Sequence, residues 1–73
     1  MAKPTRITNR ITELRTTLGM TQAELGDRIG VTRQTVNAIE GGKYSPSLEV
    51  AFKIARAFGT PLEVVFHYPD TAP

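Results

Sequence analysis

The sequence predicts a compact all-α domain of five short helices. Apolar residues recur at helical spacing; Ile11, Leu14 and Leu18, for example, stand at i, i+3 and i+7. Residues that cap helices precede such stretches, and glycine or proline follows them. The β signal is confined to residues 6–8 and 65–68, near the two ends of the chain. Helices therefore carry the fold, and any sheet is small.

Length and composition exclude several classes of protein. The 73 residues make one domain, residues 1–73, whose core is small enough that a partner subunit would help to stabilise it. The absence of cysteine excludes a disulfide framework and a thiolate zinc site, and we expect no metal or cofactor. No stretch approaches the ~20 apolar residues of a membrane span, and the polar start lacks a signal-peptide core, so we expect a cytoplasmic protein. A net charge of +2 is only mildly basic and does not by itself identify a nucleic-acid binder.

Residues 21–43 predict two short helices joined by a tight turn. Thr21 and Glu24 form a capping box at the start of the first of them, and Gly30 can end it because glycine adopts positive φ without steric penalty. Thr32 can cap the following helix. Val36 and Ile39 give that helix a buried side, and Gly41 and Gly42 end it. Two capped helices joined by a glycine turn form a helix-turn-helix.

The second of these helices has an unusually polar face. Its first turn carries Arg33, Gln34 and Thr35, and Asn37 follows. These side chains have the donors and acceptors that contact base edges and phosphates, and the positive end of the helix dipole also favours phosphate. A merely solvated helix face is the alternative interpretation. The capped pair of helices around these residues favours DNA.

The remaining helices are placed by the same signals. A first helix is expected from Arg10 to about Leu18, with Asn9 as its cap, after residues 1–8, which we expect to be flexible or extended. Ser47 can cap a fourth helix. Its wide apolar face predicts a central position in the core and consists of Leu48, Val50, Ala51, Phe52, Ile54, Ala55 and Phe58.

A short fifth helix is predicted near the end of the chain. Thr60 and Glu63 form a second capping box, with Pro61 at the first helical position. Residues 67–73 after it are expected to be flexible or extended. His67 is the sole histidine and has no catalytic partners around it, so we do not expect an enzyme, and no pocket for a small-molecule ligand is evident.

Laid out in this way, the sequence resembles the Xre/Cro-type helix-turn-helix DNA-binding domains, the fold of the phage repressors. The resemblance covers roughly residues 9–66 and is carried by LRTTLGMTQAELGDRIGVTRQTVNAIEGGK and YSPSLEVAFKIARAFGTPLEVVF. It implies that Gln22 holds a phosphate and braces the recognition helix, and that Lys43 and the backbone N–H groups beside it clamp another phosphate. The full set of DNA-contacting positions implied or expected is Gln22, Thr32, Arg33, Gln34, Thr35, Asn37, Ala38, Lys43 and Tyr44.

The resemblance also implies a structural ion pair between Arg15 and Glu40, which would tie the first helix to the end of the third. Two positions depart from the family pattern. Gly26 stands where alanine is usual, and we expect this to weaken its helix by about 1 kcal/mol. Gly41 replaces the usual asparagine before Gly-Lys, which removes one side chain that could contact phosphate.

The function implied is sequence-specific binding of double-stranded DNA by a transcriptional regulator, a repressor, bacterial or phage-encoded. Short members of the family often act as homodimers on inverted repeats, and in some the chain ends pair as a short antiparallel sheet. Candidate dimer contacts are Leu62, Val65, Phe66 and Tyr68, with closure of the monomer core as the alternative for the first three. The competing function is an antitoxin-like or other protein-interaction module on the same fold, although only seven residues follow Phe66.

Overall fold

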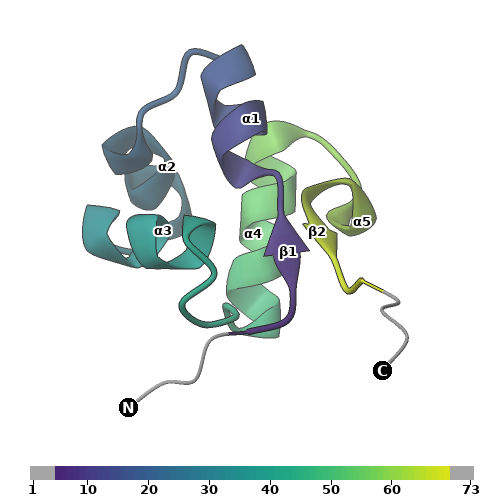
Figure 1. The fold of residues 1–73 in the computed structure, drawn as a ribbon. Helices are drawn as coiled ribbons and strands as arrows, with labels where there is room; N and C mark the ends of the chain where they lie inside the picture. The colour runs from purple at the N-terminus through teal and green to yellow at the C-terminus, as the bar shows by residue number, and fades with distance from the viewer. Residues whose placement is uncertain (1–4, 70–73) are drawn as a thin grey trace.

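The computed structural model describes residues 5–69, and within them five helices and one strand pair are present (Figure 1). This confirms the predicted five-helix architecture; the predictions for residues 1–4 and 70–73 lie outside the described residues. No helix in the described part is long and apolar enough to cross a membrane. The elements, in order, are β1 (Thr8–Asn9), α1 (Ile11–Thr17), α2 (Gln22–Ile29), α3 (Arg33–Glu40), α4 (Leu48–Phe58), α5 (Leu62–Val65) and β2 (Phe66–His67).

The strands near the two ends of the chain pair with each other. They run antiparallel, with Thr8 opposite His67 and Asn9 opposite Phe66. Each strand is only two residues long, and both lie in or beside the segments that carried the β signal. In Figure 1 the pair lies beside α5 and in front of α4, on the other side of the molecule from α2 and α3.

The hydrophobic core is built around α4. Ala51, Ile54, Ala55 and Phe58 form the buried stripe of this helix at i, i+3, i+4 and i+7. Every other helix, the last one included, adds at least one buried apolar side chain to the cluster. The largest of the fully buried side chains in the described part are Ile11, Leu25, Val36, Ile54 and Val65.

Three apolar residues that the spacing assigned to buried faces are exposed instead. Leu18 is 56% exposed, Leu48 is 69% exposed and Phe52 is 50% exposed. The two in α4 lie beside its buried stripe, and no helix or strand within residues 5–69 buries them. Leu18 lies beyond the last turn of α1, where the chain turns towards α2.

Most of the predicted helix caps are present in the structure. Thr21 and Glu24 form the predicted capping box, with N–H···O distances of 3.0 and 2.8 Å, and Gly30 ends α2 with a φ of 77°. Thr32 and Ser47 cap α3 and α4 through their hydroxyl oxygens. Helix α1 begins one residue later than predicted, so Asn9 is not its N-cap residue, although the Asn9 side-chain oxygen still accepts the Ile11 N–H at 3.0 Å.

The predicted second capping box is wrong. Helix α5 has Pro61 as its N-cap residue and no side-chain cap, and the Thr60 hydroxyl is buried without a hydrogen-bond partner in the described region. The reason lies in the preceding helix. The Thr60 N–H donates to the Ala55 carbonyl at 3.1 Å and closes the end of α4, so this N–H is not available to the Glu63 side chain as a capping box requires.

Candidate nucleic-acid interface

Helix α3 presents its amino-terminal end to solvent. Thr32 Oγ1 accepts the Thr35 N–H at 3.1 Å, and the two hydroxyl groups are 3.0 Å apart. Thr35 is therefore engaged in the cap of the helix. The flanking Arg33 and Gln34 are exposed, and their side chains form no hydrogen bond or ion pair within residues 5–69. These two side chains are available for an external partner.

Helix α2 braces α3 through one side chain. Gln22, the first residue of α2, donates from Nε2 to Asn37 Oδ1 at 3.2 Å and to Glu40 Oε1 at 3.0 Å. The predicted bracing role of Gln22 thus has a specific geometry. Both hydrogens on Nε2 are engaged in these bonds. The Gln22 donor that is left for a phosphate is therefore its backbone N–H at the start of the helix.

The predicted ion pair ties α1 to the end of α3. Arg15 Nε donates to Glu40 Oε2 at 2.8 Å, and the side chains are only 14% and 7% exposed. A second nitrogen of Arg15 binds the Met20 carbonyl at 2.9 Å, so the guanidinium also holds the connection between α1 and α2. Thr12 adds a hydrogen bond to Glu40 at 2.8 Å, a contact that no pattern in the sequence predicts.

The Glu40 carboxylate is held in its charged form. Burial acts to raise its pKa, but the hydrogen bonds from Arg15, Gln22 and Thr12 outweigh burial, and the pKa lies below its ordinary value. A carboxylate accepts hydrogen bonds and cannot donate them. Its donors are therefore fixed in orientation as long as it stays ionised.

The end of α3 differs from the phosphate clamp that the resemblance implied. The N–H groups of Gly41, Gly42 and Lys43 donate to the carbonyls of Asn37, Ile39 and Ala38 at 3.0–3.1 Å. These backbone donors are thus used to close the helix, and the Lys43 ammonium remains for phosphate. Tyr44 is half-buried against the core, and Ala38 is also half-buried.

Asn9 is a positioning residue that the sequence analysis missed. Its side-chain nitrogen donates to the Ile39 carbonyl at 3.0 Å, which joins β1 to the last turn of α3. Thr5 N–H also reaches the Gly42 carbonyl, at 3.3 Å. An asparagine before a helix signals a local cap, and nothing in the sequence indicates a partner 30 residues away.

Gly26 is required by close packing in the turn between α2 and α3. A Cβ atom on it would lie 2.7 Å from the Val31 carbonyl oxygen and 3.3 Å from the Thr32 carbonyl carbon. Both are backbone atoms, which cannot move aside as a flexible side chain can. The departure from the usual alanine therefore belongs to a turn that closes tightly, and it is not simply a weakened helix.

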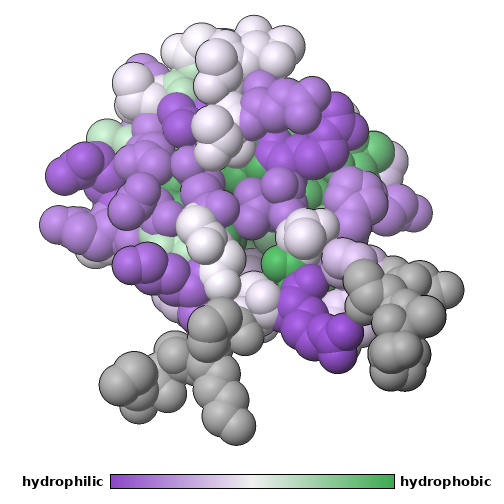
Figure 2. Space-filling model, viewed as in Figure 1, coloured by the Kyte–Doolittle hydropathy of each residue, from purple (hydrophilic) through white to green (hydrophobic). Residues whose placement is uncertain are grey.

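The candidate dimer residues have different environments. Val65 is fully buried and closes the core of the monomer, so it is removed from the candidate contacts. Leu62 and Phe66 are half-buried, and Tyr68 is 69% exposed. The first two line an apolar groove of about 260 Å³, whose other lining residues are Ile7, Ser45, Pro46, Leu48 and Ala51. The view in Figure 2 is mainly hydrophilic, with small separate hydrophobic areas.

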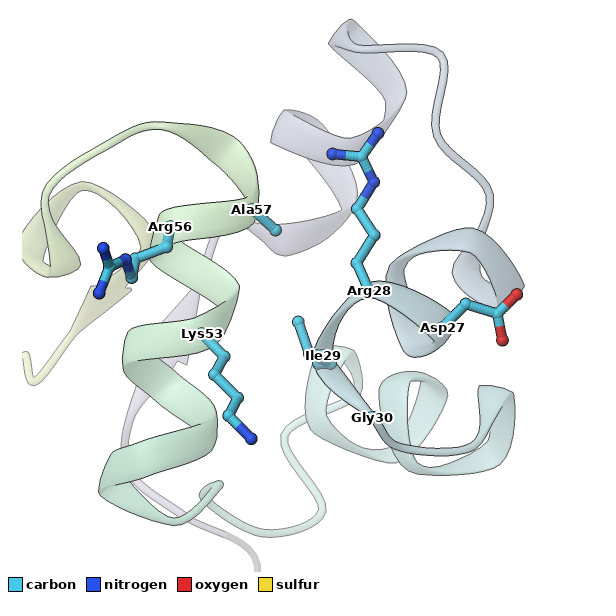
Figure 3. Close-up of a pocket in the computed structure, with 7 residues that line it drawn as sticks. All are labelled: Asp27, Arg28, Ile29, Gly30, Lys53, Arg56 and Ala57. Carbon is cyan, nitrogen blue, oxygen red and sulfur yellow. The ribbon is translucent and has the colours of Figure 1, made fainter.

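A larger hollow lies between α2 and α4, but its charges do not converge. It is about 660 Å³, is wide open to solvent and is lined by residues that include Arg28, Lys53 and Arg56. In Figure 3 the Arg28 and Arg56 side chains point away from each other, and Asp27 points outward from α2. The arrangement does not form a ligand site. The polar α3 surface, with its cap, its brace and two free side chains, defines a DNA-binding protein of the helix-turn-helix class.

Comparison with known proteins agrees with this class. A family model described as helix-turn-helix matches residues 11–65, and the chain belongs to this Xre-like helix-turn-helix family. Its members among the relatives below are described as HTH-type transcriptional regulators, which is a class of DNA-binding proteins and not of enzymes.

Named relatives and a solved structure are similar over most of the chain. An uncharacterised HTH-type transcriptional regulator of Methanocaldococcus jannaschii is 48% identical over 62 residues, which are 85% of this chain and 94% of that protein. A Bacillus subtilis protein of the same description is 53% identical over 58 residues, 80% of this chain and 88% of that protein. The Vibrio cholerae cryptic phage CTXphi transcriptional repressor RstR is 37% identical over 54 residues, 74% of this chain and 49% of that protein.

The fold is also found in a crystal structure of a candidate DNA-binding protein from Bacteroides fragilis. The TM-score is 0.76 at 21% sequence identity, and the match covers 84% of this chain and 98% of that one.

Proposed function

We propose that the protein is a sequence-specific transcriptional regulator, and specifically a repressor, that reads the major groove of double-stranded DNA with α3. The observation that carries this proposal is the exposed pair Arg33 and Gln34 at the capped start of α3, whose side chains are bound to nothing else within residues 5–69. Arginine pairs best with guanine and glutamine with adenine in the major groove. The names of the relatives, one of them a repressor, support the same function.

The remaining contacts would position the domain without reading sequence. We assign phosphate contacts to the Lys43 ammonium, the Gln22 backbone N–H and the Tyr44 hydroxyl. Thr32, Thr35 and Ala38 complete the surface of α3 that would face DNA, with Asn37 between them. The proposed place of action is DNA in the cytoplasm, where a bound repressor would exclude the transcription machinery.

The proposed active form is a homodimer on an inverted repeat. Two copies related by a two-fold axis would place their α3 helices about one helical turn apart, ~34 Å, in successive major grooves. The apolar groove between α4 and α5, flanked by the exposed Leu48, supports a contact between copies on the side of the molecule away from α3.

Selection of bound sequences from random duplex DNA tests this function, followed by titration of the best site at two salt concentrations. We expect an enriched inverted repeat with half-sites about one turn apart and binding that weakens as salt rises. If no sequence is enriched and only weak, salt-sensitive binding remains, the protein does not read sequence and this function is wrong.

A further inference from the structure

A chain of hydrogen bonds runs from the ion pair inside the domain to a side chain on the DNA-facing surface. It begins at Arg15 and Glu40, passes through Gln22 and ends at Asn37. Of the four, Glu40 and Arg15 are largely buried, Gln22 is half-buried and Asn37 is exposed. The order in which these groups constrain one another follows from their donors and acceptors.

The constraint starts at Glu40. Its carboxylate receives donors from Arg15, Thr12 and Gln22. Of the two ends of the Gln22 carboxamide, only the nitrogen can donate, so the nitrogen must face Glu40 and the oxygen must face away. The charge of Glu40 therefore sets the orientation of the Gln22 carboxamide.

Gln22 then sets the orientation of the Asn37 carboxamide in the same way. The second hydrogen on Gln22 Nε2 points at Asn37, 3.2 Å away, and needs an acceptor there. Asn37 must turn its oxygen inward to Gln22, and its nitrogen is directed away from α2. Asn37 Nδ2 has no hydrogen-bond partner within residues 5–69, so its two hydrogens are available to an external acceptor.

We propose that Asn37 is a specificity-determining residue that presents only its donor to DNA, and that Glu40 and Gln22 are positioning residues that enforce this orientation. The proposal rests on the function proposed above. A free asparagine favours adenine, because its oxygen accepts from N6 while its nitrogen donates to N7. With the oxygen held by Gln22, Asn37 instead favours guanine, whose N7 and O6 both accept, over adenine, whose N6 donor beside N7 would face no acceptor on Asn37.

The test is a set of four duplexes that differ only at the base pair facing Asn37, taken from the selected operator. Loss of discrimination in Asn37→Ala at a single pair identifies that position. The wild-type protein should prefer guanine over adenine there by about tenfold. Gln22→Met keeps the length of the side chain but frees the Asn37 amide to turn, and we expect binding to the adenine duplex to rise to near parity with the guanine duplex.

Thr12→Val is the matched control. Thr12 donates to the same Glu40 oxygen as Gln22 but does not touch Gln22 or Asn37. If Thr12→Val changes the base preference in the same way as Gln22→Met, the change is a general effect of loosening α3. That result would overturn the proposed relay from Glu40 through Gln22 to Asn37. An unchanged preference in Thr12→Val beside an altered one in Gln22→Met supports it.

A measurement on the free protein keeps the proposal testable if a variant folds poorly. The side-chain NH₂ protons of Gln22 should exchange slowly with water in NMR spectra, whereas those of the exposed Gln34 should exchange fast. In Glu40→Gln the amide at position 40 can donate as well as accept, so it no longer requires the Gln22 nitrogen to face it. The slow exchange of the Gln22 side-chain protons should then be lost. Fast exchange at Gln22 in the wild type would overturn the relay.

The outcomes separate this inference from the function on which it rests. If an operator is selected but Asn37→Ala weakens all sites equally, Asn37 contacts the backbone and the inference is wrong while the regulator stands. If Gln22→Met leaves the preference at the Asn37 position unchanged, the relay is wrong. If no operator is selected, the proposed function itself fails and the inference fails with it.

Discussion

At the scale of single residues, Arg33 is the proposed base-reading contact and Lys43 the proposed phosphate contact. Arg33 stands at the capped start of α3 and is free to meet a base edge, whereas Lys43 follows the end of the helix. Arg33→Ala should reduce discrimination at one base pair by about 1–3 kcal/mol. Lys43→Ala should weaken all sites alike and lower the salt slope by about 1. Titration of the two variants on matched and mismatched operators checks both; equal effects on all sites in Arg33→Ala would contradict base reading.

The charge of Glu40 contributes to stability through the largely buried ion pair with Arg15. Glu40→Ala leaves the poorly solvated Arg15 without its partner, and we expect a loss of about 3 kcal/mol in the free energy of unfolding. Urea denaturation at neutral pH measures this loss. A difference below about 1 kcal/mol would show that the pair behaves like one on the open surface.

The pH dependence of this contribution follows from the pKa of Glu40. Because the pKa is lower in the folded state than in the unfolded chain, the stabilisation is complete above the ordinary glutamate pKa and is lost as pH falls through the folded value. Wild type and Glu40→Gln should therefore differ by a constant amount above about pH 5 and converge in more acidic solution. Glu13 and Glu24 also have lowered pKa values, but they are present in both proteins and cancel in the comparison.

At the scale of the elements, the turn between α2 and α3 depends on Gly26. Gly26→Ala would gain helix propensity, but its Cβ would meet backbone atoms, and we expect a net loss of about 1–3 kcal/mol in stability. Gly41→Ala is the matched control because Gly41 has a φ of −81° and its added Cβ would lie 3.4 Å from the Asn37 oxygen. Thermal unfolding of both should show Gly26→Ala less stable and Gly41→Ala unchanged or slightly more stable; a stabilising Gly26→Ala would contradict the close approach.

Helix starts were predictable where one residue serves one helix. Thr21, Thr32 and Ser47 each cap a helix through a bond to a backbone N–H three residues on, so the signal is entirely local. The capping box predicted at Thr60 does not form, because the Thr60 N–H is already bonded to the Ala55 carbonyl at the end of α4. For Asn9 only the local contact to the start of α1 was predictable. Its side-chain nitrogen donates to the Ile39 carbonyl in α3, and no local pattern indicates such a distant partner.

Burial was harder to predict than helix position. The sequence predicts one wide apolar face on α4, yet Leu48 and Phe52 are exposed because the neighbouring helices cover only one stripe of it. Of the binding surface, the positions on α3 follow from the cap and the helical period. Two other features of this surface could not be predicted, because they depend on the folded backbone and on tertiary contacts. They are the use of the Gly42 and Lys43 N–H groups to close α3 and the hydrogen bond from Gln22 to Asn37.

At the scale of the whole molecule, the exposed apolar residues near α5 predict where a second copy binds. Leu48→Glu places a charge beside the apolar groove without disturbing the monomer core, because Leu48 is exposed. We expect at least a tenfold rise in the dimer dissociation constant, measured by sedimentation equilibrium. Leu18→Glu is the control, since Leu18 is similarly exposed but follows α1, away from the groove. If both substitutions have the same effect on the dimer dissociation constant, the groove is not the dimer interface.

The strand pair also has a consequence for the order in which the chain folds. Thr8 and His67 are 59 positions apart, so their pairing closes nearly the whole chain into a loop, and only two residues on each side contribute. We expect the helices to pack first and the strands to join last. By the same reasoning the strands should separate before the helices unfold. Amide hydrogen exchange should therefore be faster at Arg10, whose N–H donates to the Val65 carbonyl next to the strand pair, than in α2 and α4. Each such opening would also weaken the hold of Asn9 on the last turn of α3, so the rate of strand opening would limit how long that end of the helix stays fixed.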